Sequence, residues 1–556
     1  MTDHRTFCRV CNAMCGLVVT TDGDVVVRVR GDEEHALSRG YTCAKGRALG
    51  DLHHRPDRLD QPLLGRGADR RAVPWDDALD DLAARLAETR SALGPDGVAM
   101  YLASGSAFDT AGRRTAERFL RVSGSRQKYT ATTIDTPCKP LVAEAVGGWS
   151  GLTPIWDDER SSILVLFGSN PVVSHGHSNA IPDPVRRLRE FMARGGRLVV
   201  VDPRRTETAQ LATTHLQLRP GSDWLLLAWA VRSFLREIDP SERATGVDAL
   251  RAALEPLDLA TVARATDLHP TVIDAFVTEL RSHERINALT GTGCSMTATA
   301  DVTEYLLWAL HVVTDSFDAP GGMWFNPGLL SGLDRRDLPA PTPVGEGPPS
   351  APQLPRRFDE WPCVGLLDEI EAGNVRALVV VGGNPALAFP ESDRTRRVLA
   401  SLDTLAVIDV LPTATTDLAT HVLPATDQLE RADLTWLLDT YQLRVAGQYT
   451  DRVVTPRAER RPVGWMFGEL GRRLDLPVLD ADDDGTDERR QLAGVLRRAT
   501  IDGERLTTAE TSVVTSGPVH GWVTDRVLSD GRWNLAPPPL LDALVEAIDH
   551  CAAASP

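Results

Sequence analysis

The chain of 556 residues lacks the features that mark several large classes of protein. It has no excess of positive charge: the formal net charge of -17 argues against binding to nucleic acid or to an anionic membrane surface. It contains no apolar run long enough to span a bilayer. Only seven residues precede Cys8, which leaves no room for a signal peptide or a twin-arginine leader. We therefore expect a cytoplasmic protein without a membrane segment.

Cysteine is also scarce, and its distribution is uneven. Four of the eight cysteines lie within the first 43 residues, and the other four are scattered without a pairing pattern. In a cytoplasmic protein such cysteines are metal ligands or buried thiols more often than disulfides. The overall composition, 42% hydrophobic and 25% charged, is that of an ordinary globular protein, and the length predicts about three or four domains.

The four N-terminal cysteines form the most specific motif of the chain. Cys8, Cys11 and Cys15 are followed, after 27 intervening residues, by Cys43. Thiolates select zinc or iron–sulfur clusters rather than hard cations. Zinc sites usually pair their cysteines as two Cys-x2-Cys hooks, whereas three close cysteines with a remote fourth are typical of iron–sulfur sites. The spacing favours a [4Fe–4S] cluster, with structural zinc or unligated thiols as alternatives.

Two segments share the pattern of a parallel βαβ unit. An apolar strand at 162–167, a loop at 168–171, a helix at 184–193 and a strand at 197–201 precede Asp202. Residues 377–381, 382–385, 394–402 and 405–408 repeat this order before Asp409. A histidine follows each acid, 13 residues later in one copy and 12 in the other. This internal repeat predicts two similar nucleotide-type half-sites; two unrelated α/β units with shared turn chemistry are the alternative.

Other segments are predicted with less consequence for function. Residues 337–355, rich in proline and glycine, are expected to form a surface loop or linker, and the acidic residues 480–488 a solvated loop. Further helices are expected at 76–93, 224–236 and 270–283, and further strands at 97–102 and 285–289.

From Cys8 to about Pro539 the sequence resembles the dimethyl sulfoxide reductase family of molybdopterin enzymes, which includes formate dehydrogenases and nitrate reductases. The motifs that carry the resemblance are the four cysteines with Lys45 and Gly46, residues 168–171, 202–209, 219–223 and 382–385, and residues 421–426 ending at Glu430 and Arg431.

The resemblance implies an α/β, multidomain fold with a small N-terminal [4Fe–4S] domain and two parallel-sheet α/β domains related by the internal repeat. The cluster domain would span 1–58, with about 421–455 returning to it. The first α/β domain would span 138–334. The second would be discontinuous, built from 59–137, 335–420 and 456–540, and residues 541–556 would form a C-terminal tail.

The resemblance further implies two molybdopterin guanine dinucleotides holding one Mo or W. Asp202 and Asp223 would contact one guanosine, and residues 382–409 would serve the other. An acid at the carboxyl end of a strand can accept from ribose or guanine groups, and small-residue loops let backbone N–H groups approach a diphosphate. The predicted dinucleotide-binding residues are Lys45, Gly168, Ser169, Asn170, Asp202, Pro203, Arg204, Thr206, Gly221, Asp223, Gly382, Gly383, Asn384, Asp409 and Thr426.

Two residues are predicted to act at the reacting centre. Lys45, two residues after Cys43, would bridge cluster and pterin, unless it is an ordinary surface lysine. In this family a Cys, selenocysteine, Ser or Asp near residue 138 binds the metal. A soft thiolate suits the metal, so Cys138 is the predicted ligand, with Asp135 as substitute and a buried structural thiol as the alternative. Cys294 is expected to be a core or loop residue.

The sequence departs from the family pattern in two places. Formate dehydrogenases carry a histidine directly after the metal ligand, where this chain has Lys139, so formate oxidation would lose its expected proton acceptor. His175 and His177 follow nearby and are expected to be solvated loop residues. Family members also usually add a C-terminal β-barrel of roughly a hundred residues. The chain reaches only Pro556, so a separate barrel subunit, a more open site or the loss of one site are the alternatives.

The implied function is an oxidoreductase that passes electrons between a small-molecule substrate and a redox partner protein through the cluster. Two alternatives are a metal-free electron-relay subunit, like the related iron–sulfur subunit of NADH dehydrogenase, and a non-redox hydratase that uses the metal as a Lewis acid. Fold alone does not decide among them.

Overall fold

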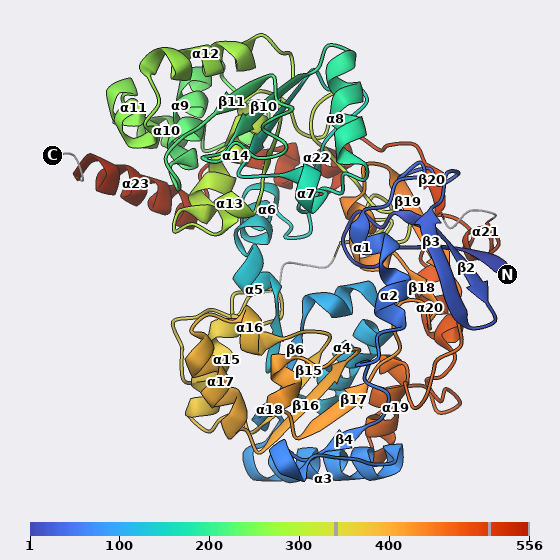
Figure 1. Ribbon diagram of the computed structural model, residues 1–556. Helices are drawn as coiled ribbons and strands as arrows, with labels where there is room; N and C mark the ends of the chain where they lie inside the picture. The colour runs from blue at the N-terminus through green and yellow to red at the C-terminus, as the bar shows by residue number, and fades with distance from the viewer. Residues whose placement is uncertain (339–342, 510–512, 554–556) are drawn as a thin grey trace.

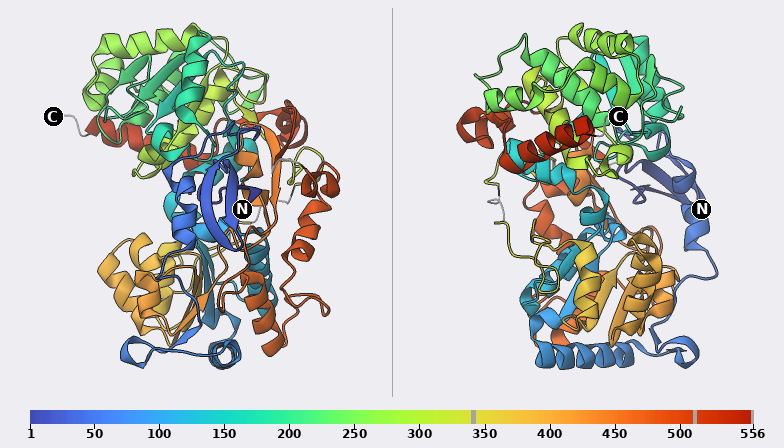
Figure 2. Two further views of the ribbon diagram at one scale, coloured as in Figure 1. Left: turned by 45° about the vertical axis from the view of Figure 1, so that its right-hand side comes forward. Right: turned by 90° about the vertical axis from the view of Figure 1, so that its left-hand side faces the viewer.

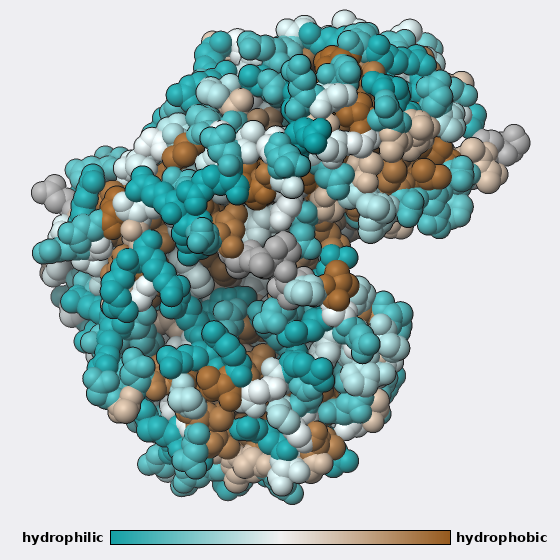
Figure 3. Space-filling view, turned by 180° about the vertical axis from the view of Figure 1, so that it is seen from behind, coloured by the Kyte–Doolittle hydropathy of each residue, from teal (hydrophilic) through white to brown (hydrophobic). Residues whose placement is uncertain are grey.

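The computed structural model describes residues 1–338, 343–509 and 513–553, which form two α/β lobes joined at one side by antiparallel sheets (Figures 1 and 2). A seven-stranded sheet forms the lower lobe of Figure 1 and a four-stranded sheet the upper one. Figure 3 shows a deep notch between the lobes on the side away from the N-terminal sheet. In the described part of the chain, no helix has the length and apolar character needed to cross a bilayer.

The lower lobe is built on a mostly parallel sheet. Its strand order is β5 (Arg71–Ala72), β4 (Leu63–Leu64), β17 (His421–Pro424), β16 (Thr404–Asp409), β15 (Ala377–Val381), β6 (Val98–Leu102) and β7 (Lys128–Thr130). The last five strands are parallel, and β4 and β5 are antiparallel additions at one edge. The continuous apolar runs of β6 and β15 fit strands covered on both faces. Helices α3 (Trp75–Leu93), α4 (Thr110–Ser123) and α19 (Val463–Arg473) cover one face; α15 (Cys363–Glu371) and α17 (Ser392–Ser401) cover the other.

The upper lobe contains an all-parallel sheet in the order β11 (Thr214–Leu216), β10 (Arg197–Val201), β9 (Ile163–Phe167) and β13 (Asn287–Thr290). Its large core includes α8 (Pro184–Ala193), α9 (Asp223–Leu235), α12 (Pro270–Arg281) and α14 (Ala300–Val313). Helix α6 (Cys138–Gly147) packs against α14. The fold is therefore of the predicted class.

The C-terminal segments lie on the upper lobe, which differs from the expected placement of 456–540 in the second α/β domain. Helix α19 does pack on the lower lobe, but β21 (Trp533–Asn534) pairs with β12 (Ala244–Thr245). The reason for this placement is apolar packing. The Trp533 ring stacks on Phe325 and is buried in the core of the upper lobe. Residues 541–553, expected to be a tail, lie in helix α23 (Pro538–Ala553), whose apolar face packs on the same core.

The N-terminal sheet is antiparallel and lies beside a second small sheet. It consists of β1 (Thr2–Phe7), β2 (Gly16–Asp22) and β3 (Val25–Gly31), and β18 (Asp433–Leu434), β19 (Val445–Thr450) and β20 (Val513–Ser516) form the other. Side chains of β19 contact the N-terminal sheet: Thr450 Oγ1 donates to Thr6 Oγ1 at 2.8 Å, and Gln448 Nε2 donates to the carbonyl of Met14 at 3.1 Å. The chain thus returns to the N-terminal segment here, whereas β17 belongs to the lower sheet.

The two lobes repeat the same loop chemistry after β9 and β15. Asn170 Oδ1 accepts from the Thr208 hydroxyl at 2.7 Å, and Asn384 Oδ1 accepts from the Thr415 hydroxyl at 2.8 Å. The same two threonines also donate their backbone N–H groups to these amide oxygens. Each asparagine precedes a one-turn helix, α7 (Pro171–Ser174) or α16 (Pro385–Ala388). Shared turn geometry of this detail supports a true internal repeat.

The repeat includes a third strand that the sequence comparison missed. Gly293 N–H donates to the Gly168 carbonyl after β13, and Gly105 N–H donates to the Gly382 carbonyl after β6. The sheet order β11-β10-β9-β13 thus matches β17-β16-β15-β6. The third strand follows the repeat in one lobe and precedes it in the other, so a linear comparison does not align it. Its signal was the small-residue loop that follows both strands.

Gly382 is required at the crossing of two loops in the lower lobe. Its φ is +65°, and an added Cβ would lie 3.0 Å from the Ser106 nitrogen. We expect Gly382→Ala to lower the free energy of unfolding by about 1–3 kcal/mol, because an L residue is strained at this φ and the backbone must also shift. Denaturant unfolding would measure this. Gly373→Ala is the matched control: φ is +77° and nothing lies within 4 Å, so its loss should be smaller. Equal losses would contradict the crossing argument.

The expected linker at 337–355 is partly described: residues 339–342 lie outside the described residues, and the remainder has no helix or strand of three or more residues. Predicted elements otherwise match closely; α8 has the predicted bounds, and β9 and β15 differ from prediction by at most one residue.

Candidate cofactor cavity and cluster site

The four motif cysteines converge at the end of the N-terminal sheet. The turn after β1 brings Cys8 and Cys15 together through a backbone hydrogen bond of 2.8 Å, and Cys43 caps helix α1 (Ala44–Arg47). Burial, then the charges of Cys11 and Cys43, raise the pKa of Cys8 to about 12. Burial, followed by the charges of the other three thiols, raises the pKa of Cys15 well above its usual value. Thiols so placed ionise readily only when metal replaces their protons.

The spacing of these thiols suits a cluster better than a single ion. A tetrahedral zinc with Zn–S bonds of about 2.3 Å would hold its sulfur atoms about 3.8 Å apart. Among the described residues, the group of three ligand atoms that lies within 4.8 Å is His53, Asp427 and Glu430, and it includes no cysteine. Among the described residues, no three of these thiols thus meet that criterion for a single-ion site.

Gly46 adjoins this space. A Cβ there would lie 2.2 Å from Thr42 Oγ1 and 3.7 Å from Cys8 Sγ, so only glycine fits without displacing the turn that carries Cys43. Lys45 precedes it and is exposed. Its charge lowers the pKa of His175, after the larger effect of burial. Lys45 thus lies close to both the cysteines and a histidine of the upper lobe.

His175 was expected to be solvated, and that expectation is wrong. Its side chain is buried, and its Nε2 lies 2.8 Å from the hydroxyl of Tyr41. Burial, then the charges of Cys43 and Cys15, raise the pKa of Tyr41 to about 12. His177 is half-buried, with Nε2 3.7 Å from Asp135 Oδ2. The sequence showed both histidines but could not show that the loop after β9 folds back onto the cluster segment.

A cavity of about 650 Å³ lies between the two lobes and the cluster segment. Its walls include Cys11 and Asn12 from the cluster turn, Ala103 and Ser104 after β6, and Ser174 and Gly176 after β9. It is also lined by Asp135, Thr136, Lys139 and His177. The structure thus gathers at one cavity the cluster turn, the segment predicted to bind the metal, and parts of the segments that follow β6 and β9.

Cys138 and Asp135 differ in their relation to this cavity. Asp135 lines it, as do Thr136 and Lys139, whereas Cys138 is 4% exposed and does not line it. Burial, then the charge of Glu304, raise the pKa of Cys138 to about 12. The role of Cys138 as a metal ligand stays a prediction.

Lys139 is held by a partner that sequence reasoning missed. Its Nζ donates to Thr290 Oγ1 at 2.7 Å and to Glu304 Oε2 at 3.2 Å. Glu304 is buried in α14 and also accepts from Trp308 Nε1 at 3.2 Å. An acid in the otherwise apolar part of α14 was the available signal. The paired ammonium is engaged in this contact, so Lys139 does not replace the missing histidine as a free proton acceptor.

The predicted dinucleotide residues occupy the carboxyl edges of the two parallel sheets. Gly168 and Gly382 have φ of +53° and +65° and lie at the loop crossings described above. Burial raises the pKa of Asp223 and of Asp409 to about 6. One carboxylate oxygen of Asp223 and the hydroxyl of Thr426 are buried without a hydrogen-bond partner among the described residues. The other predicted positions follow β9, β10 or β15 or precede α9: Ser169, Asn170, Asp202, Pro203, Arg204, Thr206, Gly221, Gly383 and Asn384.

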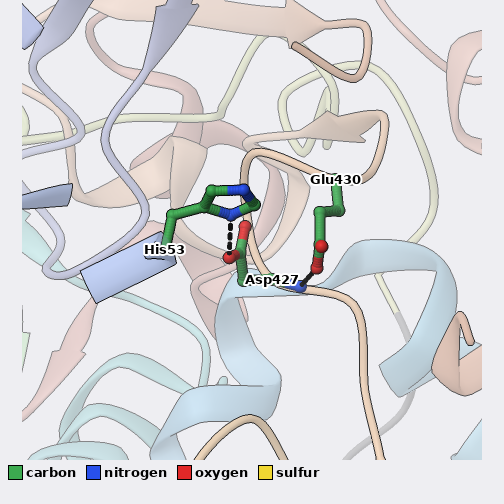
Figure 4. A group of neighbouring side chains, drawn as sticks. All are labelled: His53, Asp427 and Glu430. Carbon is green, nitrogen blue, oxygen red and sulfur yellow. Dashed lines mark hydrogen bonds and ion pairs between the residues drawn. The ribbon is translucent and has the colours of Figure 1, made fainter. Parts of the chain in front are cut away.

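One group resembles a metal site but is better explained as an ion network (Figure 4). His53 Nδ1 lies 2.7 Å from Asp427 Oδ2, and Glu430 accepts from the backbone N–H of Asp427 at 2.9 Å. Arg58 Nη1 lies 2.5 Å from the same Asp427 oxygen, and Arg460 Nη1 lies 2.7 Å from Glu430. The guanidinium groups take the place of a cation. The network joins α2 (Leu49–His53) to the loop after β17.

This network predicts an acid-sensitive fold. Burial opposes ionisation of Asp427, but the His53 hydrogen bond and the Arg58 charge outweigh it and depress its pKa. A depressed folded-state pKa contributes stability above the unfolded value of about 3.9, which is lost as the pH falls through the folded pKa. We expect Asp427→Asn to cost about 3–5 kcal/mol at pH 7, since Arg58 loses its partner. Urea unfolding of both proteins from pH 7 to pH 3 would check this. The difference between them should shrink toward pH 3; a constant difference would contradict it.

Comparisons with known proteins agree with this architecture. Residues 58–473 match the molybdopterin oxidoreductase family model, and residues 1–55 match the model of the molybdopterin oxidoreductase Fe4S4 domain. The chain is 23% identical to the probable oxidoreductase YyaE of Bacillus subtilis over 86% of this chain and 69% of that protein. It is 27% identical to a nitrate reductase of Klebsiella oxytoca over 85% of this chain, and spans 55% of that relative's length.

A further relative and a solved structure are also similar to this chain. An F420-dependent formate dehydrogenase alpha subunit of Methanococcus maripaludis is 26% identical over 76% of this chain and 63% of its own length. The solved structure of acetylene hydratase from Pelobacter acetylenicus superposes with a TM-score of 0.77, at 16% identity, over 98% of this chain and 78% of that one. This last likeness concerns the fold alone. The family match covers most of the chain, and the chain therefore belongs to the molybdopterin oxidoreductase family and carries that family's Fe4S4 domain at its N-terminus.

Proposed function

We propose that the chain is a molybdenum or tungsten oxidoreductase that binds two molybdopterin guanine dinucleotides and exchanges electrons with a partner protein through a [4Fe–4S] cluster. The observation that carries the proposal is the 650 Å³ cavity, lined by Cys11 of the cluster turn, by Asp135 and by His177. A cavity of this size, with a few convergent polar groups, is typical of small-molecule and cofactor sites. When bound, the metal and its pterins would supply two-electron chemistry, and the cluster one-electron transfer.

The residues present fit such a cofactor. The unpartnered oxygen of Asp223 and the unpartnered hydroxyl of Thr426 are buried polar groups that lack an acceptor or donor in the protein, which costs free energy unless a ligand supplies one. Gly168 and Gly382 keep the backbone of each loop crossing free of a Cβ. We propose that Asp223 and Asp202 hold one guanosine and that the region from Gly382 to Asp409 holds the other.

The protein's own groups at the cavity would position substrate and move protons. His177 Nε2 lies 3.7 Å from Asp135 Oδ2, so the carboxylate can orient the imidazole toward the cavity that both residues line. Tyr41 and His175 form a second hydrogen-bonded pair beside the cluster cysteines. Lys45 places an exposed positive charge near Cys11, where it would stabilise added negative charge. Cys138 or Asp135 would bind the metal.

Element and nucleotide analysis of the protein purified without oxygen tests the proposal. We expect about four Fe, one Mo or W, and two GMP released by acid hydrolysis per chain. Iron without Mo, W or GMP would refute the oxidoreductase proposal for this chain alone and favour the electron relay. Co-purification of a small barrel protein with the cofactor would instead place part of the site on a second subunit.

A non-redox hydration reaction is the second candidate. It is favoured by the fold shared with acetylene hydratase and by the acid–base pair of Asp135 and His177 at the cavity. A hydratase would turn over without a continuous electron acceptor, whereas an oxidoreductase would stop when its acceptor is withheld. Turnover with and without a dye acceptor separates the two. Nitrate and formate are the first substrates to test in this assay, because relatives are named nitrate reductase and formate dehydrogenase.

A further inference from the structure

A second cavity, separate from the cofactor cavity, opens between α4 and α20 (Glu488–Leu496) and holds about 480 Å³. Six arginines and three acids line it, so its walls carry an excess of positive charge in a protein whose formal net charge is -17. The indole of Trp436 lines both cavities. We call this second space the arginine cavity, after Arg114, Arg118, Arg121, Arg490, Arg497 and Arg498.

The acids of the cavity already have cationic partners. Glu117 lies 3.2 Å from Arg113 and 3.8 Å from Lys128, both of which are outside the set of six. Asp480 lies 3.9 Å from Arg118. Arg490 lies 2.6 Å from Asp482 and 3.9 Å from Asp483. Of the six arginines, Arg118 and Arg490 therefore have a carboxylate partner.

The remaining four arginines have no carboxylate of their own. Within the described residues, no carboxylate oxygen lies within 4.0 Å of the guanidinium groups of Arg114, Arg121, Arg497 and Arg498. Burial and the charges of Arg498 and Arg121 lower the pKa of Arg114, even though Glu117 opposes this. Like charges gathered in a partly enclosed space repel one another, and a bound anion would remove that repulsion.

Two of the guanidinium groups approach one position on the cavity wall. The position that a Cβ on Gly494 would take lies 3.6 Å from Arg114 Nη2 and 3.8 Å from Arg497 Nη2. The absence of a side chain at residue 494 leaves room between them. Arg114 also packs on the Trp436 ring, whose centroid lies 5.1 Å from its Cζ. Arg121, Arg497 and Arg498 are exposed at the mouth of the cavity.

We propose that the arginine cavity binds a small molecule that carries two or more linked phosphoryl groups, such as a nucleoside diphosphate or triphosphate. Planar guanidinium forks bind phosphoryl oxygens through two parallel hydrogen bonds. Four unpaired cations exceed the charge of about -1.5 to -2 on one phosphate, so a single phosphate would leave roughly half of them unneutralised. The volume is within the range of small-molecule sites.

Calorimetric titration of the full chain with pyrophosphate, ATP, inorganic phosphate and sulfate tests the proposal at physiological salt. We expect pyrophosphate or ATP to bind at least about ten-fold more tightly than phosphate or sulfate, with affinity falling as salt rises. Tighter binding of ATP than of pyrophosphate would indicate a nucleotide, and the reverse a free oligophosphate; either supports the site. Equal binding of all four anions, or none, would overturn it. Binding of polyglutamate but not of pyrophosphate would also overturn it, in favour of an acidic protein partner.

Arginine variants test whether pyrophosphate binds at the arginine cavity. Arg114→Gln combined with Arg498→Gln should weaken pyrophosphate binding about 100-fold, at about ten-fold for each charged contact. Arg236→Gln is the matched control, because Arg236 is an exposed arginine at the end of α9, in the upper lobe. It should bind as the unaltered protein does. Unchanged binding in the double variant would overturn the proposal.

Thermal unfolding separates binding from a structural role. Without added anion, Arg114→Gln should leave the unfolding midpoint unchanged or raise it, because one of several repelling charges is removed. If the arginines were structural, the midpoint would fall. Added pyrophosphate should raise the midpoint of the unaltered protein and not that of the double variant.

Discussion

Replacing Cys15 by serine is expected to remove the iron–sulfur cluster and with it all electron transfer to a partner. Cys15 is 5% exposed and lies in the turn that also carries Cys8 and Cys11. A serine oxygen is a harder ligand than the thiolates that clusters select. Iron should fall from about four atoms per chain to less than one, and the visible absorbance of the cluster should disappear.

The fold of the N-terminal segment should weaken in the same variant. Bound clusters contribute folding free energy because a preformed site rarely exists in the unfolded chain. Limited proteolysis should therefore cut within the first 58 residues while the two lobes remain intact. The control is Cys551→Ser, at a half-exposed thiol near the C-terminal end of α23. It should keep full iron content. Retention of iron in Cys15→Ser would refute the ligand set, and loss in Cys551→Ser would show general instability.

Cys138→Ala is expected to abolish turnover, with a loss greater than about 1,000-fold, while iron content and fold remain. The reason is that the thiolate would be the protein's own bond to the metal, and even outer contacts of metal sites cost about 10–100-fold when removed. Asp135→Asn should cost about 10–100-fold, because Asp135 would lose only its charge interaction with His177. Initial rates with a dye acceptor, together with Mo and W content, measure both effects.

The reverse outcome, in which Asp135→Asn and not Cys138→Ala abolishes turnover, would identify a different metal ligand. Asp135 lines the cofactor cavity, whereas Cys138, at the start of α6, is buried and does not line it. If Asp135→Asn abolishes turnover and Cys138→Ala does not, Asp135 is the metal ligand. Cys363→Ala controls for loss of a buried thiol. Its sulfur donates to the Thr130 carbonyl at 2.6 Å, so this variant should lose stability but keep turnover.

A relay subunit would respond differently to the same variants. Electron transfer through the cluster does not involve residue 138, so Cys138→Ala would leave it unchanged in a relay. The single substitution therefore tests the enzyme proposal independently of the substrate, provided that reduction of the cluster is followed alongside turnover.

Local sequence patterns predicted six strands of the two parallel sheets, β6, β9, β10, β13, β15 and β16, because strands buried on both faces appear as continuous apolar runs. The short strands β7, β11 and β17 were not predicted. The cysteine spacing also indicated the Fe4S4 domain that the family comparison shows. The placement of residues 513–553 was not predictable in this way. Trp533 is as apolar as any core residue, and nothing local to it shows that its partners are Phe317 and Phe325 of the upper lobe.

The sequence by itself determined the family, the class of fold, the cluster motif and the two copies of the nucleotide-type loop, because these depend on residue type and short-range order. Only the tertiary structure decided which of these lie together: His175 against Tyr41, Asp135 facing His177, Glu304 pairing with Lys139, and β13 corresponding to β6. The three side-chain contacts join residues 42 to 165 positions apart in the sequence. They depend on how two lobes and a small sheet pack around a cavity, which no local pattern records.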